Sequence, residues 1–395
     1  MKKILVKIYN EKDQFIMDWD KAIFQGFSKE INAGPGECVL RLAEKFDYGG
    51  GELKLGNFVR VLVSDKETIS LPDGYLVIYS GYISMIETWD DGKKEGIDVH
   101  LLGDYTKLGV DILKNGAQTT LYSDSTAGLT VTSPGDAADV GLMARAVITR
   151  YRAETVNPRI NFSPESIPLA SSTQSYFFEQ KTYREALEKL LTIAPAGYYY
   201  YINENGVLTF KQKSTTVKHR FEFQKHISSI RVQKGIEKMK NCVLLWNGAA
   251  DPDDIYKKYE DTASIIKYGR RTELKEDYGI VDAAGADAIG ASFISQNKLP
   301  ESRIIVDIVD NSADSVNGYD IESIDPGDTC SFVGIDDFLA DIFYSNMIIT
   351  KVDYSLDKAT VTIENYGSGI LDWQEKTNRE LNDLRRKGGL PESYS

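Results

Sequence analysis

The chain of 395 residues contains few side chains whose types and spacing could support catalysis or metal binding. It has three histidines, His100, His219 and His226, and none belongs to the HExxH pair that binds zinc from one face of a helix. The alternating pattern around His100 predicts a strand with this histidine on its polar side. His219 and His226 lie in a region with a β pattern. We therefore expect structural or surface roles for all three.

One acidic segment has part of the spacing of a calcium-binding loop. Asp310, Ser312 and Asp314 occupy positions 1, 3 and 5 of such a loop. Position 6 needs a glycine for the sharp turn, but Ser315 stands there. Position 12 usually supplies a bidentate glutamate, and here it is Ile321. These departures favour a solvated loop over a calcium site.

A second acidic cluster leaves hydrolytic chemistry open. Asp251, Asp253 and Asp254 lie in a loop that contains a proline, and solvation is again the preferred interpretation. Two carboxylates for glycoside hydrolysis need only meet in space, which a sequence does not reveal. A cell-wall glycan hydrolase therefore remains the alternative to a structural role.

The run Tyr198 to Tyr201 could stack on sugars or bases, as in a glycan-binding module. Successive tyrosines in a strand more often divide between a core face and an interface. We prefer that division, and it predicts that this strand lies at a contact between parts of the structure.

The remaining chemical signatures are weak. No nucleophile elbow, Walker loop or dinucleotide-binding glycine motif occurs, and residues 49–51 (Gly-Gly-Gly) lack the Lys-Ser/Thr partner of a phosphate cradle. Cys38, Cys242 and Cys330 are far apart in apolar surroundings, which predicts buried thiols and a reducing compartment. We assign no catalytic, cofactor-binding or metal-binding residue and expect no cofactor.

Composition narrows the function classes further. Hydrophobic residues make up 42% and charged residues 27% of the chain, as in ordinary soluble proteins. The net charge of −13 argues against a general nucleic-acid binder, which needs a basic surface. The first residues lack the features of a signal peptide, and no stretch approaches the roughly 20 apolar residues of a membrane span. We expect a soluble protein without a membrane span.

Hydrophobic periodicity predicts an α+β fold that is mainly β. Helices are expected over 136–152, over 182–193 after a capping box of Thr182 and Glu185, over 282–299 and over 370–387. The following division is predicted: residues 1–104, a first β-domain; 105–216, an α+β insertion; 217–270, the first part of a second β-domain; 271–300, a helical insertion; 301–368, the rest of the second β-domain; and 369–395, a C-terminal helix and tail.

Residues 79–103 and 344–367 look like two copies of one hairpin. Both begin with Tyr-Ser, continue as a strand, turn over a short polar loop and return as an alternating strand. Each follows a glycine-containing segment, 55–57 (Leu-Gly-Asn) in the first copy and 326–328 (Pro-Gly-Asp) in the second. Chance likeness between two hairpins is the alternative. A β-domain used twice in one chain is typical of an architectural part.

The order of several segments resembles the hub proteins of bacteriophage tails, which join the tail tube to the distal tip. The likeness spans nearly the whole chain and depends on order, since each motif alone is weak. It is carried by residues 34–38, 55–58, 79–82, 183–187, 197–199, 205–208, 241, 243–246, 268–271 and 324–328.

The resemblance implies two tail-tube-like β-barrel or sandwich domains in each chain and a homotrimer with six such domains. Its implied partners are the tail tube or a distal tail protein, a tape-measure protein and tip, spike or receptor-binding proteins. DNA would pass through the lumen without specific binding, and the protein would lie at the distal end of the virion tail after assembly in the host cytoplasm. The appended lysozyme or peptidase domain of some tail proteins is missing here, so cell-wall degradation is not implied.

Overall fold

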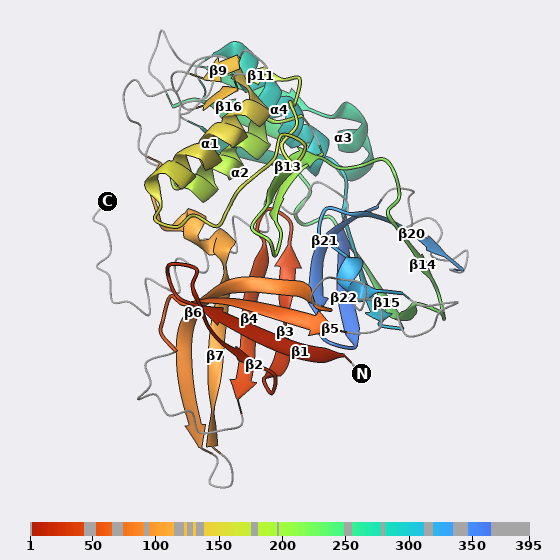
Figure 1. Ribbon diagram of the computed structural model, residues 1–395. Helices are drawn as coiled ribbons and strands as arrows, with labels where there is room; N and C mark the ends of the chain where they lie inside the picture. Colours follow the sequence, from red (N-terminus) through yellow and green to blue (C-terminus); the bar gives the residue numbers. More distant parts are fainter. Residues whose placement is uncertain are drawn as a thin grey trace.

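The computed structural model describes residues 2–42, 53–64, 74–90, 95–113, 122–124, 129–131, 138–174, 181–195, 197–248, 255–277, 280, 282–311, 319–334 and 347–364. Its strands and helices confirm the mainly β, α+β class (Figure 1). The predicted helix over 370–387, residues 49–51 and the cluster at 251–254 lie outside the described residues, as do Ser312 and Asp314.

One large sheet of 13 strands dominates the lower part of Figure 1. Two groups of strands compose it, here named the first and second β-unit. The first β-unit contains β1 (Lys3–Tyr9), β2 (Phe15–Trp19), β3 (Ile23–Glu30), β4 (Pro35–Leu42), β5 (Phe58–Ser64), β6 (Leu76–Asp90) and β7 (Glu95–Gly103). The second β-unit contains β14 (His219–Glu222), β15 (Ile227–Gly235), β19 (Glu301–Val309), β20 (Thr329–Val333), β21 (Met347–Tyr354) and β22 (Lys358–Glu364).

The two β-units have matching strand orders. The first runs β3-β4-β7-β6-β5, and the second runs β15-β19-β22-β21-β20, with every neighbouring pair antiparallel. Beyond these five strands they differ, because β1 is antiparallel to β5 whereas β14 is parallel to β20. A single hydrophobic core extends through both units. The predicted β-domains are therefore joined in one sheet.

The same β-bulge occurs in both copies of the repeated hairpin. The pairing of β6 with β7 skips Ser84, and that of β21 with β22 skips Thr350. Each skipped residue donates its hydroxyl across the hairpin, Ser84 Oγ to the His100 carbonyl at 3.1 Å and Thr350 Oγ1 to the Thr362 carbonyl at 3.2 Å. A bulge is a local, specific feature of a strand. Its repetition with the same hydrogen bond supports a true internal duplication.

The glycine turn before each hairpin is also repeated. Gly56 has φ of +88° and Gly327 has φ of +90°, a region that favours glycine. The Gly56 N–H donates to the Ile83 carbonyl at 2.8 Å, and the Gly327 N–H donates to the Ile349 carbonyl at 2.8 Å. In both copies the isoleucine N–H donates in return to the residue after the glycine, at 2.9 Å. The sequence repeat therefore extends to backbone geometry.

An α+β layer lies above the large sheet in Figure 1. Its first part contains α1 (Val140–Glu154), α2 (Tyr183–Ile193), β12 (Tyr198–Ile202) and β13 (Leu208–Gln212), with the short pairs β8 (Tyr122–Asp124) with β9 (Leu129–Val131) and β10 (Ala138–Asp139) with β11 (Thr173–Gln174). The capping box of Thr182 and Glu185 is present. Short 3₁₀ helices cover Asp104–Gly109 and Ile321–Ser323.

The second part of this layer corrects one strand assignment. Residues 243–246 were expected in the second β-domain, but β16 (Cys242–Trp246) pairs with β17 (Tyr256–Glu260) and β18 (Thr272–Glu276) in a separate sheet. This sheet packs on α4 (Ala283–Asn297), and α3 (Thr262–Tyr268) follows β17. Leu245 belongs to the hydrophobic core that contains α1 and α2. An apolar run predicts a buried strand but not the sheet that it joins.

Two element boundaries also differ from the prediction. The helix expected over 136–152 begins at Val140, because the Asp139 carboxylate accepts hydrogen bonds from the Gly141 and Leu142 N–H groups at 2.8 and 3.3 Å. The first strand of the repeated hairpin at 79–103 begins earlier, at Leu76, because β6 continues through its bulge as one strand to Asp90. Both errors concern local hydrogen bonds that periodicity does not report.

The two glycine turns provide a matched test of the duplication. A Cβ at Gly327 would lie 2.2 Å from the buried Tyr199 ring, whereas a Cβ at Gly56 would meet only the Glu11 carboxylate at 3.8 Å. We expect Gly56→Ala to cost about 1–2 kcal/mol of unfolding free energy from its positive φ. Gly327→Ala should cost about 1–3 kcal/mol more, because the ring must move. Chemical denaturation measures both, and equal losses would contradict this account.

Candidate assembly interface

The two β-units meet where β21 pairs antiparallel with β3. The pairing runs from Tyr354 opposite Phe27 to Lys351 opposite Glu30. The Phe27 ring lies 5.3 Å from the Tyr354 ring and 5.0 Å from the Tyr79 ring, measured between centroids. Both backbone pairing and aromatic packing therefore join the units. This seam is named the intrachain junction.

A buried lysine reinforces the intrachain junction. Lys29 of β3 is 6% exposed, and its Nζ lies 2.9 Å from Asp325 Oδ1 and 3.4 Å from Glu204 Oε2. Burial alone would lower the pKa of this ammonium, but interactions that include both carboxylates raise the pKa well above its ordinary value. Asp325 precedes the glycine turn of the second β-unit, and Glu204 lies in the loop between β12 and β13. One cation thus connects three parts of the chain.

The β12–β13 hairpin inserts its tyrosines at the same place. Tyr198 and Tyr200 belong to the core of the α+β layer. Tyr199 and Tyr201 pack instead with Ile31, next to β3, and Ile348 of β21. All four tyrosines are buried, so the expected division between a core face and an interface describes the observed packing, and the interface is internal to the chain.

Backbone hydrogen bonds fix this hairpin to the turn between β3 and β4. The Asn32 N–H donates to the Tyr200 carbonyl at 2.7 Å, and the Asn32 side-chain oxygen accepts from the Tyr200 N–H at 3.2 Å. Asn32 has φ of +58°, and asparagine tolerates that conformation better than most residues. No local pattern in the sequence indicates this role of Asn32, since it and Tyr200 are 168 residues apart.

Two histidines occupy structural positions. His219 is buried, with Nε2 2.9 Å from Asp328 Oδ2 and Nδ1 2.6 Å from the Tyr319 hydroxyl. Burial would raise the pKa of Asp328, but hydrogen bonds from His219 and Lys218 outweigh it and lower that pKa. Asp328 belongs to the glycine turn of the second β-unit, so this cluster holds the turn. The His226 ring packs at 5.1 Å from Tyr319.

The third histidine lies on the polar face of β7, as the alternating pattern predicts. His100 Nδ1 is 2.8 Å from Glu37 Oε1, and Nε2 is 3.7 Å from Glu87 Oε2. No group of three or more metal-ligating side chains occurs in the described part of the chain. Asp310 pairs with Lys2 at 2.7 Å, which ties the first strand to the second β-unit.

A carboxyl with a raised pKa lies inside the α+β layer. Burial raises the pKa of Glu188 to about 8 against the opposing effect of Arg184. Its Oε1 lies 3.0 Å from Arg184 Nε and 3.4 Å from the Tyr200 hydroxyl. Such a group could act as a general acid, but these partners come from α2 and β12 and orient it within the fold. The contacts match a structural ion pair.

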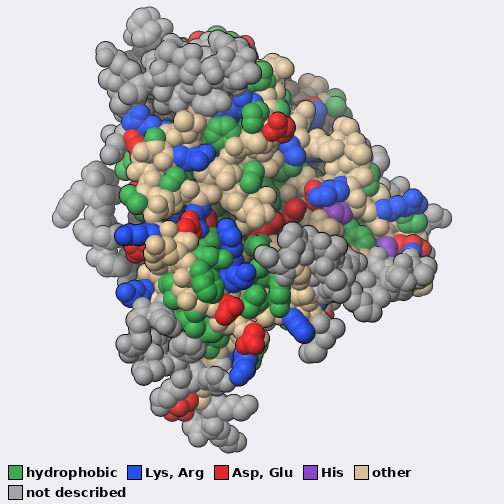
Figure 2. Space-filling model, in the orientation of Figure 1, with side chains coloured by type: hydrophobic (Ala, Val, Ile, Leu, Met, Phe, Trp, Pro, Cys, Tyr) green, Lys and Arg blue, Asp and Glu red, His purple; other side chains and the backbone are tan. Residues whose placement is uncertain are grey.

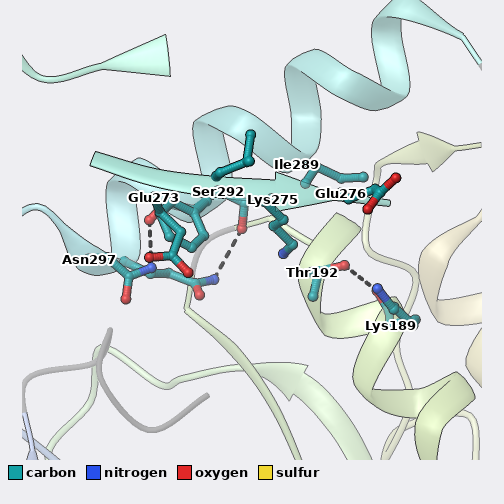
Figure 3. A pocket seen from close by; sticks show the side chains of 11 residues that line it. Lys189, Thr192, Glu273, Lys275, Glu276, Ile289, Ser292 and Asn297 are labelled. Carbon is teal, nitrogen blue, oxygen red and sulfur yellow. Dashed lines mark hydrogen bonds between the residues drawn. The ribbon is translucent and has the colours of Figure 1, made fainter. Parts of the chain in front are cut away.

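A pocket of about 260 Å³ lies between α2, β18 and α4 (Figure 3). Lys275 is half-buried, and Figure 3 shows its side chain directed away from β18 toward α2. Burial, aided by Lys189, lowers the pKa of Lys275 to about 8. Lys189 itself lies 3.2 Å from Asp277 Oδ2. The pocket combines one perturbed amine with amide and carboxylate groups but lacks a nucleophile–base pair.

Comparison with solved structures identifies the fold. The 43 kDa tail protein of prophage MuSo2 from Shewanella oneidensis is 13% identical, with a TM-score of 0.58 over 92% of this chain and 98% of that chain. Prophage tail protein gp18 from Listeria monocytogenes is 14% identical, with a TM-score of 0.55 over 96% and 99%. A tail protein from Neisseria meningitidis is 9% identical, with a TM-score of 0.57 over 94% and 98%.

The chain has the fold of prophage tail proteins. This likeness extends over nearly the whole length of each protein, so it includes both β-units and the α+β layer. No family model matches the sequence, and no curated protein matches it significantly. Among the described helices of this tail-protein fold, none is long and apolar enough to cross a membrane.

Lys29 provides the first test of the intrachain junction. Lys29→Met leaves Asp325 and Glu204 without their buried cation, and we expect a loss of about 3 kcal/mol in the free energy of unfolding. Lys358→Met is the control, because Lys358 pairs with Asp307 at 3.1 Å but is 47% exposed. The control should lose less than about 1 kcal/mol. Urea denaturation of both variants would contradict the role of Lys29 if their losses were equal.

Lys275 provides a second test, through pH. Its folded pKa of about 8 lies below the unfolded value of about 10.4, so the folded state binds fewer protons between these values. Stability from this group therefore rises with pH across that window. Lys275→Met should be more stable than the parent by on the order of 1 kcal/mol at pH 7, and the gain should disappear near pH 10.5. A gain independent of pH would show that repacking, rather than titration, causes it.

Proposed function

We propose that this chain is a non-enzymatic structural hub of a phage tail, which forms a homotrimeric ring at the distal end of the tail tube. The observation that carries the proposal is the duplication. Two β-units share a five-strand order, a bulge and a glycine turn, and the intrachain junction joins them edge to edge. Three such chains supply six like units in a ring while keeping threefold symmetry for the tip.

The proposal follows from the symmetry of closed assemblies. Head-to-tail contacts form a ring only when the rotation per subunit closes the circle. If each β-unit spans one sixth of the circle, each chain of two β-units spans one third of it. The upper surface then matches a sixfold tail tube or distal tail protein, and the lower surface matches a threefold tip, spike or receptor-binding protein.

Surface composition supports a role in assembly. Figure 2 shows hydrophobic side chains gathered with basic ones over the lower half of the molecule, where the first β-unit lies. In that unit Phe15, Ile23 and Met85 are exposed. Apolar side chains that gather on one face of a protein mark a candidate surface for contact with other proteins. The net charge of −13 suits a lumen that passes DNA or a tape-measure protein without binding DNA.

The predicted division of the chain belongs to this proposal. The β-domains at 1–104 and, in two parts, 217–270 and 301–368 would build the ring, although β16 leaves the large sheet. The insertions at 105–216 and 271–300 would extend outward from it. The protein would assemble in the host cytoplasm and remain in the virion tail.

The test combines solution mass with particle imaging. Native mass spectrometry and light scattering of the full chain should give a trimer, and antibody labelling of tail particles should mark the distal end. A monomer at all concentrations, without label on tails, would overturn the proposal. Host cell walls serve as a separate substrate: clearing of their turbidity by the purified chain would instead favour the hydrolase alternative.

A further inference from the structure

We propose that the ring closes by extension of the β-sheet from chain to chain, with β6 of one protomer pairing antiparallel with β15 of the next. This inference rests on the proposed ring and names the surface that closes it. Within the chain, β21 of the second β-unit pairs with β3 of the first. The equivalent of β21 is β6, and the equivalent of β3 is β15. The contact between chains would therefore repeat the intrachain junction.

Strand pairing defines these equivalences. Ser84 and Thr350 are the bulged residues, so Met85 corresponds to Lys351 and Thr88 to Tyr354. On the other side, Phe27 lies opposite Cys38 of β4, and Val232 lies opposite Ile304 of β19. Cys38 and Ile304 then pair with equivalent positions of β7 and β22. Phe27 and Val232 are therefore equivalent.

The register of the interface follows directly. Tyr354 opposite Phe27 in the intrachain junction becomes Thr88 opposite Val232 of the next protomer. The next position along each strand pairs Glu87 with Gln233. At the far end of this four-residue pairing between chains, Met85 lies opposite Gly235 of the next protomer.

Both edges are available in the described part of the chain. β15 is the last strand in the order of the large sheet, with β19 as its only neighbour there. β5 pairs with β6 only as far as Tyr82, and the glycine turn at residues 56–57 bonds to Ile83, so residues 85–90 of β6 pair with β7 alone among the described strands. Figure 1 places β6 and β15 at opposite sides of the β-layer, as a head-to-tail contact requires.

Two devices that commonly block an edge strand, proline and short length, are absent from β15. Natural edge strands are also blunted by charged side chains and β-bulges, and here β15 carries Arg231 and Lys234 while β6 carries the bulge at Ser84. β15 has nine residues without a proline, and its Ile230 and Val232 side chains pack against the core. On β6, the Met85 side chain is 47% exposed beside exposed Glu87 and Thr88. A long, regular edge and an exposed apolar side chain both fit a strand partner.

Charge supports the same register. Glu87 would face Gln233 of the next protomer, and Arg231 lies two residues along β15 on the same face. Diagonal neighbours at this spacing are within reach of long side chains. Glu87 and Arg231 are both exposed in the single chain, so this opposite pair would form without losing an existing buried contact.

The test is a disulfide at the proposed register. Glu87→Cys with Gln233→Cys in the full chain places two exposed thiols opposite each other across the interface. The natural Cys38, Cys242 and Cys330 are buried and should not react. Mild oxidation should give a covalent species of three chains on a denaturing gel. Each single-cysteine variant should stay uncrosslinked, because the contact is head-to-tail.

A second pair fixes the register. Glu87→Cys with Ser229→Cys moves one thiol four residues along β15, about 13 Å from the facing position. This control should form no covalent trimer. A trimer by native mass that crosslinks no better at 87 with 233 than in the control would overturn the strand pairing while leaving the ring intact. A chain that is monomeric by native mass would overturn the ring itself.

Discussion

An unpaired sheet edge is the constraint on which this structure depends. Each edge strand presents backbone N–H and C=O groups that will pair with another strand unless something covers them. Here one such edge, β3, is covered by β21 of the same chain. That pairing makes two β-units into one sheet with one core. The described strands leave several edges, including β2, and we propose that the sheet grows through those along β15 and the distal part of β6.

The α+β layer stabilises the intrachain junction by polar and aromatic contacts together. The β12–β13 hairpin supplies Tyr199 and Tyr201 to the seam, and its loop supplies Glu204 to Lys29. A buried lysine is tolerated only with paired charge, and Lys29 has carboxylates from two separate segments. The seam is therefore specified by residues from three parts of the chain, which disfavours slippage of β21 along β3.

The sequence predicted local structure better than long-range contacts. The capping box at Thr182 and the repeated hairpins depend on neighbouring residues, and the structure contains both. The place of β16 and the partners of Lys29 depend on residues far away in the chain, which periodicity does not encode. The repeat was visible because the bulge and the glycine turn are themselves local. The intrachain junction, which joins the two copies, could be recognised only from the structure.

The two copies have the same backbone in different surroundings, and this difference bears on symmetry. Gly327 lies against Tyr199, whereas Gly56 has open space beside it. Two residues before the glycine stands Asp325 in the second copy, which binds Lys29, and Lys54 in the first. A contact between chains that repeats the backbone pairing would therefore lack this ion pair. Strong junctions inside each chain would alternate with weaker ones between chains. Such a ring would have six similar β-units, but the strength of the contacts between them would repeat only three times around the circle. An adaptor between a sixfold tube and a threefold tip requires both symmetries.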